Sequence, residues 1–184
     1  MPSATAPLIA DLELGDPSVT NLRYVKGFRS WGPAGPRGLP LFKPPYGRIT
    51  ALDMNKGEIV WQVANGDGPR DNPAIAHLDL GPLGNPGHGA PLVTKTLLFV
   101  GEGSDAMVNA ARVPPGMPFE EAPKYGEPWF RAYDKATGAV LAEIALPAGT
   151  TSAPMTYLHG GKQYIVVAVG GRNAAAEWVA LSVP

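Results

Sequence analysis

The sequence contains no cysteine, and this absence excludes disulfide bonds and thiolate metal sites. Charge is also scarce, because only 17% of the 184 residues are charged, against about a quarter in an average soluble protein. The net charge at pH 7 is −1. With no basic excess and no acidic run, the composition indicates neither a nucleic-acid partner nor a charged tail.

Several kinds of segment and motif are missing as well. No run of about 18 apolar residues is present, so we expect no transmembrane helix. The opening residues, MPSATAPLIADLELGDPS, lack a basic segment followed by an apolar one, so we expect no signal peptide. The patterns GxxxxGK[ST], HExxH and GxSxG do not occur, which argues against a phosphate-binding loop, a zinc protease and a serine hydrolase.

What the sequence has in quantity is glycine and proline, with 23 and 21 residues. This composition is typical of short strands joined by many turns and loops. No segment keeps apolar residues at helical spacing over the length of a typical helix, so we predict an all-β protein. We expect residues 1–47 to be irregular and loop-rich, with no strand or helix in the stretch Gly27–Gly47, and residues 48–184 to hold the β-structure.

Alternating apolar and β-branched residues predict the strands of this second part. They are expected at 48–53, 58–63, 90–94, 96–103, 129–134, 139–146, 152–158, 162–171 and 177–183. Two intervening segments, 64–89 and 104–128, are longer than ordinary connections in a compact domain. We therefore expect the first of them to be a functional loop or a lid.

A strand–turn–strand unit occurs twice, at Ile49–Trp61 and Phe130–Ala142, with an offset of 81 residues (134 − 53). In both copies an Asp opens the turn and a Gly closes it, as Asp53 and Gly57 do in the first. An Asp carboxylate accepts hydrogen bonds from the amides of a tight turn, and Gly tolerates a positive φ. Repeated hairpins of this kind are typical of propeller blades, but a β-sandwich with similar turns fits the periodicity equally well.

Several motifs resemble those of the pyrroloquinoline-quinone (PQQ) dependent dehydrogenases. The unit ALDMNKGEIVW (51–61) resembles their tryptophan-docking motif, Ala-x-Asp-x-x-x-Gly-x-x-x-Trp. The segment LPAGTTSAPMTYLHGGKQYIVVAVGG (146–171) is similar to the closing segment of the membrane-bound glucose dehydrogenase branch, and PYGRITALD and HGAPLVTKTLLFVGEG match that branch in the same order. The resemblance covers about residues 38–184 and implies that Trp61 packs against the next blade, whereas Ala142 replaces the second docking tryptophan.

The resemblance also implies a fold and an activity. The fold is a partial β-propeller, with about two four-stranded blades and a closing strand of an eight-bladed whole, and the missing blades lie upstream. The implied reaction oxidises a sugar or alcohol substrate by hydride transfer to PQQ, with Ca²⁺ as Lewis acid and a quinone or cytochrome as electron acceptor. The implied location is periplasmic or membrane-associated. Catalytic residues and calcium ligands would lie in earlier blades, so we assign none in this chain and expect it to be inactive alone.

Candidate cofactor-binding residues follow from the same resemblance. They are Gly87, His88, Gly89, Gly170, Gly171 and Arg172. His88 would stack on the flat quinone, the Gly170-Gly171 backbone would approach it, and Arg172 would pair with a PQQ carboxylate. In the plainer alternative, His88 is an exposed loop residue, the two glycines end a strand and Arg172 is a solvated charge.

The remaining polar residues give weaker signals. His77 and His159 are not at ligand spacing to each other or to His88, and we expect Glu102 to be an exposed charge at the rim. Two other functional classes stay open. One is a non-catalytic propeller that serves as a scaffold for a partner, and the other is a carbohydrate-binding sandwich of two closed sheets.

Overall fold

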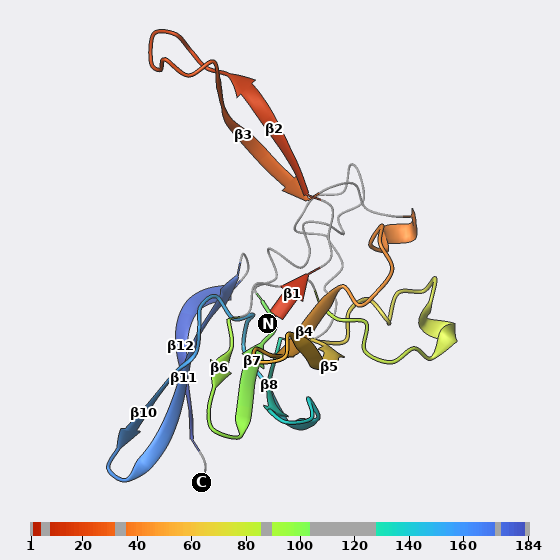
Figure 1. The fold of residues 1–184 in the computed structure, drawn as a ribbon, viewed down its shortest axis with the longest axis vertical. Helices are drawn as coiled ribbons and strands as arrows, with labels where there is room; N and C mark the ends of the chain where they lie inside the picture. The colour runs from red at the N-terminus through yellow and green to blue at the C-terminus, as the bar shows by residue number, and fades with distance from the viewer. Residues whose placement is uncertain are drawn as a thin grey trace.

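The computed structural model describes residues 2–4, 8–31, 36–85, 90–103, 128–171 and 174–182. Within these residues the regular structure is β-strand, apart from two single-turn 3₁₀ helices, η1 (Pro36–Gly38) and η2 (Ala76–Leu78) (Figure 1). The strands are β1 (Pro2–Ala4), β2 (Leu8–Leu14), β3 (Tyr24–Trp31), β4 (Gly47–Asp53), β5 (Glu58–Ala64), β6 (Leu92–Val93), β7 (Leu97–Gly101), β8 (Trp129–Asp134), β9 (Val140–Ala145), β10 (Met155–His159), β11 (Lys162–Gly171) and β12 (Ala174–Ser182). The prediction of an all-β protein is confirmed.

All the strands predicted after residue 47 are present, and their ends agree with the prediction to within three residues. The N-terminal expectation is wrong in part. Strand β3 runs through Gly27 to Trp31, inside the stretch expected to hold no strand, and η1 follows at Pro36–Gly38. Strand β3 forms because β2 supplies an antiparallel partner along its length, a pairing that glycine and proline content does not reveal.

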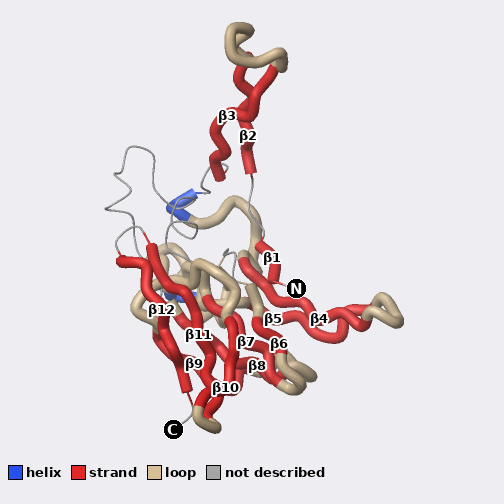
Figure 2. Tube along the Cα trace, turned by 90° about the vertical axis from the view of Figure 1, so that its left-hand side faces the viewer, coloured by secondary structure: helices blue, strands red, loops and turns tan. Residues whose placement is uncertain are grey.

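The β2–β3 hairpin stands apart from the other strands (Figures 1 and 2). Strand β1 behaves differently, because it pairs with β4 and so joins the structure formed by the rest of the chain. The division into residues 1–47 and 48–184 stays a prediction. The pairing of β1 with β4 connects the two parts.

Three further antiparallel sheets follow one another along the chain. The first sheet has the order β1-β4-β5, the second β6-β7-β8-β9 and the third β10-β11-β12. One four-stranded blade is thus present in the described part of the chain, flanked by two sheets of three strands. In the second and third sheets consecutive strands pair in chain order, which is the meander expected of propeller blades, whereas β1 of the first sheet pairs with β4 and the intervening β2 and β3 form a separate hairpin.

The second sheet packs against a neighbouring sheet on each of its two faces, mainly through β7 and β8. On one face, Leu98, Val100 and Tyr133 pack with Ile49 and Trp61 of the first sheet. The opposite face of the second sheet packs against the third sheet, in a cluster of buried side chains made of Phe130, Leu146, Ala148, Val167 and Val169. A sandwich of two sheets has one such interface, whereas radially stacked blades have one between each pair of neighbours. The two successive interfaces therefore favour the propeller.

The two repeated hairpins have the same turn chemistry, as their sequences predict. In the first, Asp53 Oδ1 accepts hydrogen bonds from the amides of Asn55 and Lys56, at 2.9 and 3.2 Å, and Gly57 has φ +71°. In the second, Asp134 Oδ1 accepts from Ala136 and Thr137, at 2.8 and 2.9 Å. The hydrogen bonds from Thr137 lower the pKa of the Asp134 carboxyl.

Trp61 joins the first sheet to the second. Its indole Nε1 donates a hydrogen bond of 3.0 Å to the carbonyl oxygen of Lys135, in the turn between β8 and β9. Its ring covers Gly138, which has φ +76°, and a Cβ added at Gly138 would lie 2.7 Å from Trp61 Cε3. The glycine therefore serves both the turn and the close approach of the indole ring.

Candidate functional site

A compact loop covers one end of the second sheet. Three backbone hydrogen bonds close the loop 65–85 on itself, each between a residue near its start and one near its end. They run from Asn85 N to Asn65 O, from Gly84 N to Gly66 O and from Leu83 N to Asp67 O. A loop with its ends paired and its own side chains packed inside is an Ω-type loop, a form that often carries function. The loop is ordered by its own contacts and is a fixed cover of the sheet end.

Inside the loop, Asn72 organises the chain. Its Oδ1 accepts a hydrogen bond of 2.9 Å from the amide of Ala74, and its Nδ2 donates one of 3.1 Å to the carbonyl oxygen of Arg37. The side chain is buried, with 4% of its surface exposed. Asn72 therefore ties the loop to the segment that leads into β4.

Thr150 connects the ends of the second and third sheets. Its amide and its Oγ1 both donate to the carbonyl oxygen of Glu102, at 2.9 and 3.0 Å. It also forms isolated bridges to Gly103 and to Val169 in β11. A side chain at Gly101 would collide with Thr150, so glycine is needed there for this approach. The segment around Thr150 thus lies between the ends of β7 and β11 and connects them.

A buried ion pair lies under the loop, at this junction. The guanidinium of Arg131 donates to the carboxylate of Glu102, and both residues expose 5% of their surface. Asn85 of the loop also donates, through Nδ2, to Glu102. Arg131 has two further partners, because Nε donates to Glu143 Oε1 at 2.5 Å and the Asp67 carboxylate lies 3.9 Å away.

Burial and charge act against each other in this pair. Burial raises the pKa of the Glu102 carboxyl, and the charge of Arg131 and its hydrogen bond oppose that shift. Burial acts to lower the pKa of Arg131, but the charge and hydrogen bonds of the carboxylates outweigh it and the pKa lies above its ordinary value. Arg131 therefore stays charged, and its positive charge is fully compensated by its neighbours.

Tyr133 extends the polar cluster into the core. Its hydroxyl lies 3.2 Å from Asn65 Oδ1 and donates a hydrogen bond to it, and its side chain is completely buried. Burial raises the pKa of Tyr133 to about 12. The phenol is therefore neutral over the whole physiological range and acts as a hydrogen-bond donor.

This cluster of charged and polar side chains holds the loop 65–85 to the second sheet. An anionic quinone with several carboxylates needs uncompensated cations, but Arg131 is already shared among three carboxylates and Glu102 adds a buried negative charge. The cluster consequently does not fit PQQ, and no chemical step is assigned to it. Asn85 Oδ1 is a buried acceptor for which the described residues provide no hydrogen-bond partner.

The predicted cofactor residues fall into two groups. Gly87, His88, Gly89 and Arg172 lie outside the described residues. Gly170 and Gly171 end β11, and the Gly170 amide donates a 3.0 Å hydrogen bond to the carbonyl oxygen of Gly149. A Cβ added at Gly170 would lie 3.4 Å from the Cα of Ala176 in β12. Its lack of a side chain suits the packing of β11 against β12, and its role at a cofactor stays a prediction.

The expectation for Glu102 is wrong, since this residue is buried and not an exposed rim charge. It was misplaced because its burial depends on Asn85 and Arg131, which are 17 and 29 residues away in the sequence. One signal was present: Glu102 stands between two glycines directly after an apolar strand, a position where a single carboxylate is unusual.

Metal-binding clusters and membrane-spanning helices are both missing from the described residues. No group of three or more His, Asp or Glu side chains among them is arranged to hold a metal ion. None of the helices in the described part of the chain has the length and apolar character needed to cross a membrane.

Antiparallel sheets that stack face to face in chain order, the first tied to the second by a docked indole ring, define a segment of a β-propeller. A comparison with protein families agrees with this class. Residues 21–165 match the PQQ family described as "Glucose/ethanol/alcohol dehydrogenase, beta-propeller domain". The chain belongs to this quinoprotein family.

Individual relatives have related names. The chain is 31% identical over 144 residues to the quinate/shikimate dehydrogenase (quinone) of Acinetobacter baylyi, covering 76% of this chain and 15% of that protein. It is 32% identical over 142 residues to the quinoprotein glucose dehydrogenase of Escherichia coli K12, with coverage of 76% and 15%. For the glycerol dehydrogenase large subunit of Gluconobacter thailandicus the identity is 31%, with coverage of 74% and 16%. The chain thus spans about a sixth of the length of these relatives.

Proposed function

We propose that this chain forms late blades of a PQQ-dependent dehydrogenase that oxidises a sugar or another alcohol. The family match over residues 21–165 carries the proposal, and the docking of Trp61 on the next sheet supports it. The relatives are named for glucose, glycerol and quinate, and each of these compounds carries hydroxyl groups. In such an enzyme, bound PQQ accepts the hydride from the substrate.

The part played by this segment follows from its geometry. The buried Glu102–Arg131 pair, Asn85 and Thr150 hold the loop 65–85 and the ends of β7 and β11 in fixed positions. Loops at one end of a rigid scaffold are the usual place for binding residues. The six candidate residues that the family resemblance implies contribute to the cofactor site in this proposal: Gly87, His88, Gly89, Gly170, Gly171 and Arg172.

The remaining components belong to the proposal as well. Upstream blades supply the catalytic carboxylate and the calcium ligands, and a quinone or a cytochrome takes the electrons. The name of the Acinetobacter relative includes a quinone, which supports the quinone as acceptor. The protein acts in the periplasm or at its membrane surface.

An exchange of segments tests the proposal. The matching segment of the E. coli quinoprotein glucose dehydrogenase is replaced by the corresponding residues of this chain, and PQQ-dependent reduction of an artificial acceptor is measured with glucose. We expect the hybrid to fold and to turn over, whereas the isolated chain with PQQ, Ca²⁺ and glucose stays inactive. A folded hybrid that does not bind PQQ contradicts the proposal and favours the non-catalytic scaffold, and turnover by the isolated chain contradicts the assignment of catalytic groups to other blades.

A further inference from the structure

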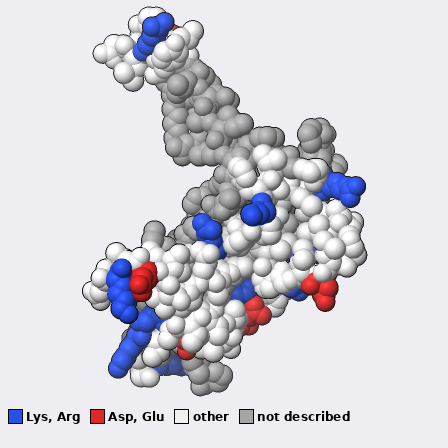
Figure 3. Space-filling view, turned by 45° about the vertical axis from the view of Figure 1, so that its right-hand side comes forward, with Lys and Arg blue, Asp and Glu red and all other residues white. Residues whose placement is uncertain are grey.

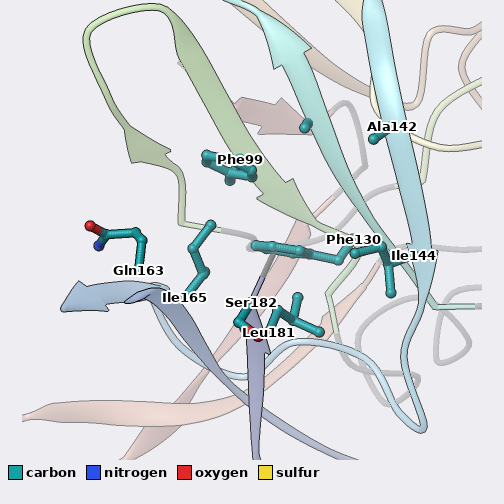
Figure 4. A pocket seen from close by; sticks show the side chains of 9 residues that line it. Phe99, Phe130, Ala142, Ile144, Gln163, Ile165, Leu181 and Ser182 are labelled. Carbon is teal, nitrogen blue, oxygen red and sulfur yellow. The ribbon is translucent and has the colours of Figure 1, made fainter. Parts of the chain in front are cut away.

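An apolar cavity of about 320 Å³ lies between the second and third sheets (Figure 4). Side chains from both sheets line it, and Figure 4 shows the rings of Phe99 and Phe130 on one side and Ile165 and Leu181 on the other. The side of the cavity formed by β9 is exposed to solvent. Ala142 is exposed there, and Ile144, two residues further along the strand, is 44% exposed. We call this space the docking cavity.

The docking cavity occupies the place that Trp61 fills in the preceding interface. Trp61 pairs with Ala51 across β4 and β5, and Ala142 pairs with Ala132 across β8 and β9. The register shifts directly after these pairs in both hairpins, so the two bulges also correspond. A bulge sets the direction of the neighbouring side chain, and Ala142 therefore points where an indole ring would reach the third sheet.

The opposite walls of the two interfaces also correspond. Trp61 packs with Leu98 and Tyr133, which are paired across β7 and β8. The wall that faces Ala142 contains Ile165 and Leu181, which are paired across β11 and β12 in the same way. The third sheet thus presents an apolar surface suited to an indole ring, and Ala142 supplies only a methyl group toward it.

The walls determine which molecules this space accepts. Phe99 and Phe130 are stacked, with ring centroids 6.0 Å apart and an angle of 14° between their planes. Further flat rings pack well on such faces. Among the described residues that line the cavity, only Gln163 and Ser182 have polar side chains, so a charged ligand would lose its hydration without gaining an ionic partner from them. Apolar cavities of about 150 Å³ already bind benzene, and ligand pockets begin at about 300 Å³.

We propose that the docking cavity binds a small uncharged aromatic molecule of about the size of indole. The bound ring occupies the position of the missing docking tryptophan and connects the second sheet to the third, as Trp61 connects the first to the second. Because such a ligand binds only the stacked sheets, it stabilises the folded chain by RT ln(1 + [L]/Kd), which keeps rising with ligand concentration. This site is independent of the PQQ chemistry proposed above.

Titration of the full chain with indole tests the site. Methyl signals of Ala142, Ile165 and Leu181 are followed by NMR, together with intermolecular Overhauser effects from the indole protons. We expect saturable shifts at these three methyl groups and direct Overhauser contacts to Ala142 and Leu181. Indole-3-carboxylate should bind at least about tenfold more weakly, because its charge must be buried in an uncharged cavity.

Two variants provide a matched comparison. Ala142→Trp places an indole ring in the cavity and should weaken indole binding at least tenfold while raising the melting temperature. Leu141→Trp adds the same side chain at a neighbouring bulge residue that is 58% exposed and does not line the cavity, and it should leave indole binding within twofold of the wild type. Undiminished binding to a folded Ala142→Trp variant would overturn the proposal. If that variant does not fold, the Overhauser contacts in the wild type decide, and their absence up to the solubility limit of indole also overturns it.

Discussion

Tyr133 shows how burial of one residue sets a pH dependence for the chain. Its pKa rises from 10.0 to about 12 in the folded state, because the phenolate cannot be hydrated in the core. The stability that depends on the neutral phenol is therefore fully present below pH 10 and is lost as the pH rises to about 12. Two pKa units correspond to a loss of about 2 to 3 kcal/mol.

The variant Tyr133→Phe tests this pH dependence. We expect its free energy of unfolding to fall less than that of the wild type between pH 10 and 12, although it loses the hydrogen bond to Asn65 and is less stable near pH 7. Urea unfolding at a series of pH values measures both effects. Parallel pH profiles for the two proteins would show that Tyr133 is not buried as described.

The buried pair of Glu102 and Arg131 gives a second prediction at the residue scale. Glu102→Ala leaves Arg131 and the Asn85 amide without their main partner, so we expect a loss of about 3 to 5 kcal/mol in the free energy of unfolding. The side chain of Glu143, another partner of Arg131, is 46% exposed. Glu143→Ala should therefore cost about 1 kcal/mol or less in the free energy of unfolding. Similar losses for the two variants in chemical denaturation would contradict the buried position of Glu102.

The residues that sequence reasoning located and missed differ in the range of their contacts. The turn at Asp53 and Gly57 could be predicted because every partner lies within four residues. Glu102 could not be placed, because its partners come from a loop and a strand far away in the sequence. The candidate site was therefore predicted less well than the strands, because it is built from contacts between residues that are far apart in the sequence.

At the scale of elements, the hairpin β8–β9 and its contact with Trp61 are the main feature. Gly57 and Gly138 have nearly the same φ, +71° and +76°, but only Gly138 has a neighbour within 4 Å of an added Cβ. Gly57→Ala should therefore cost only the backbone strain of about 1 to 2 kcal/mol. Gly138→Ala should cost about 1 to 3 kcal/mol more, because the methyl group displaces the indole ring.

Thermal or chemical unfolding of the two glycine variants measures the difference. Their backbone strain cancels in the comparison, so the remaining difference reports the contact between the two sheets. Equal losses would mean that Trp61 does not cover Gly138. The strands of these hairpins were predictable from alternation alone, whereas β3 was not, because it runs into a stretch rich in glycine and proline and its pairing with β2 depends on residues up to 23 positions away.

For the whole molecule, the outer strands leave apolar surface uncovered. Ile59 in β5 is 62% exposed, Leu158 in β10 is 67% exposed and Trp178 in β12 is 73% exposed. Figure 3 shows one face of the molecule, most of which is formed by side chains other than Lys, Arg, Asp and Glu. Exposed apolar strands at sheet edges promote association between chains.

We therefore expect the chain to self-associate in a concentration-dependent manner in sedimentation velocity experiments. Ile59→Lys combined with Leu158→Lys should shift the distribution toward the monomer without a large change in melting temperature. Val19, which is 82% exposed in the loop between β2 and β3, provides the control, and Val19→Lys should change association much less. A wild-type chain that stays monomeric at about 100 µM would contradict this prediction.

The central claim is that consecutive sheets of this chain stack as propeller blades, with Trp61 of one sheet docked on the hairpin of the next. The most direct measurement is the nuclear Overhauser effect between the Trp61 indole ring and the Hα protons of Gly138 in the full chain. The structure predicts strong effects, because the ring covers this glycine and Nε1 is bonded to the carbonyl oxygen of Lys135. A folded chain in which the indole protons of Trp61 show no contact with Gly138 would contradict the stacking.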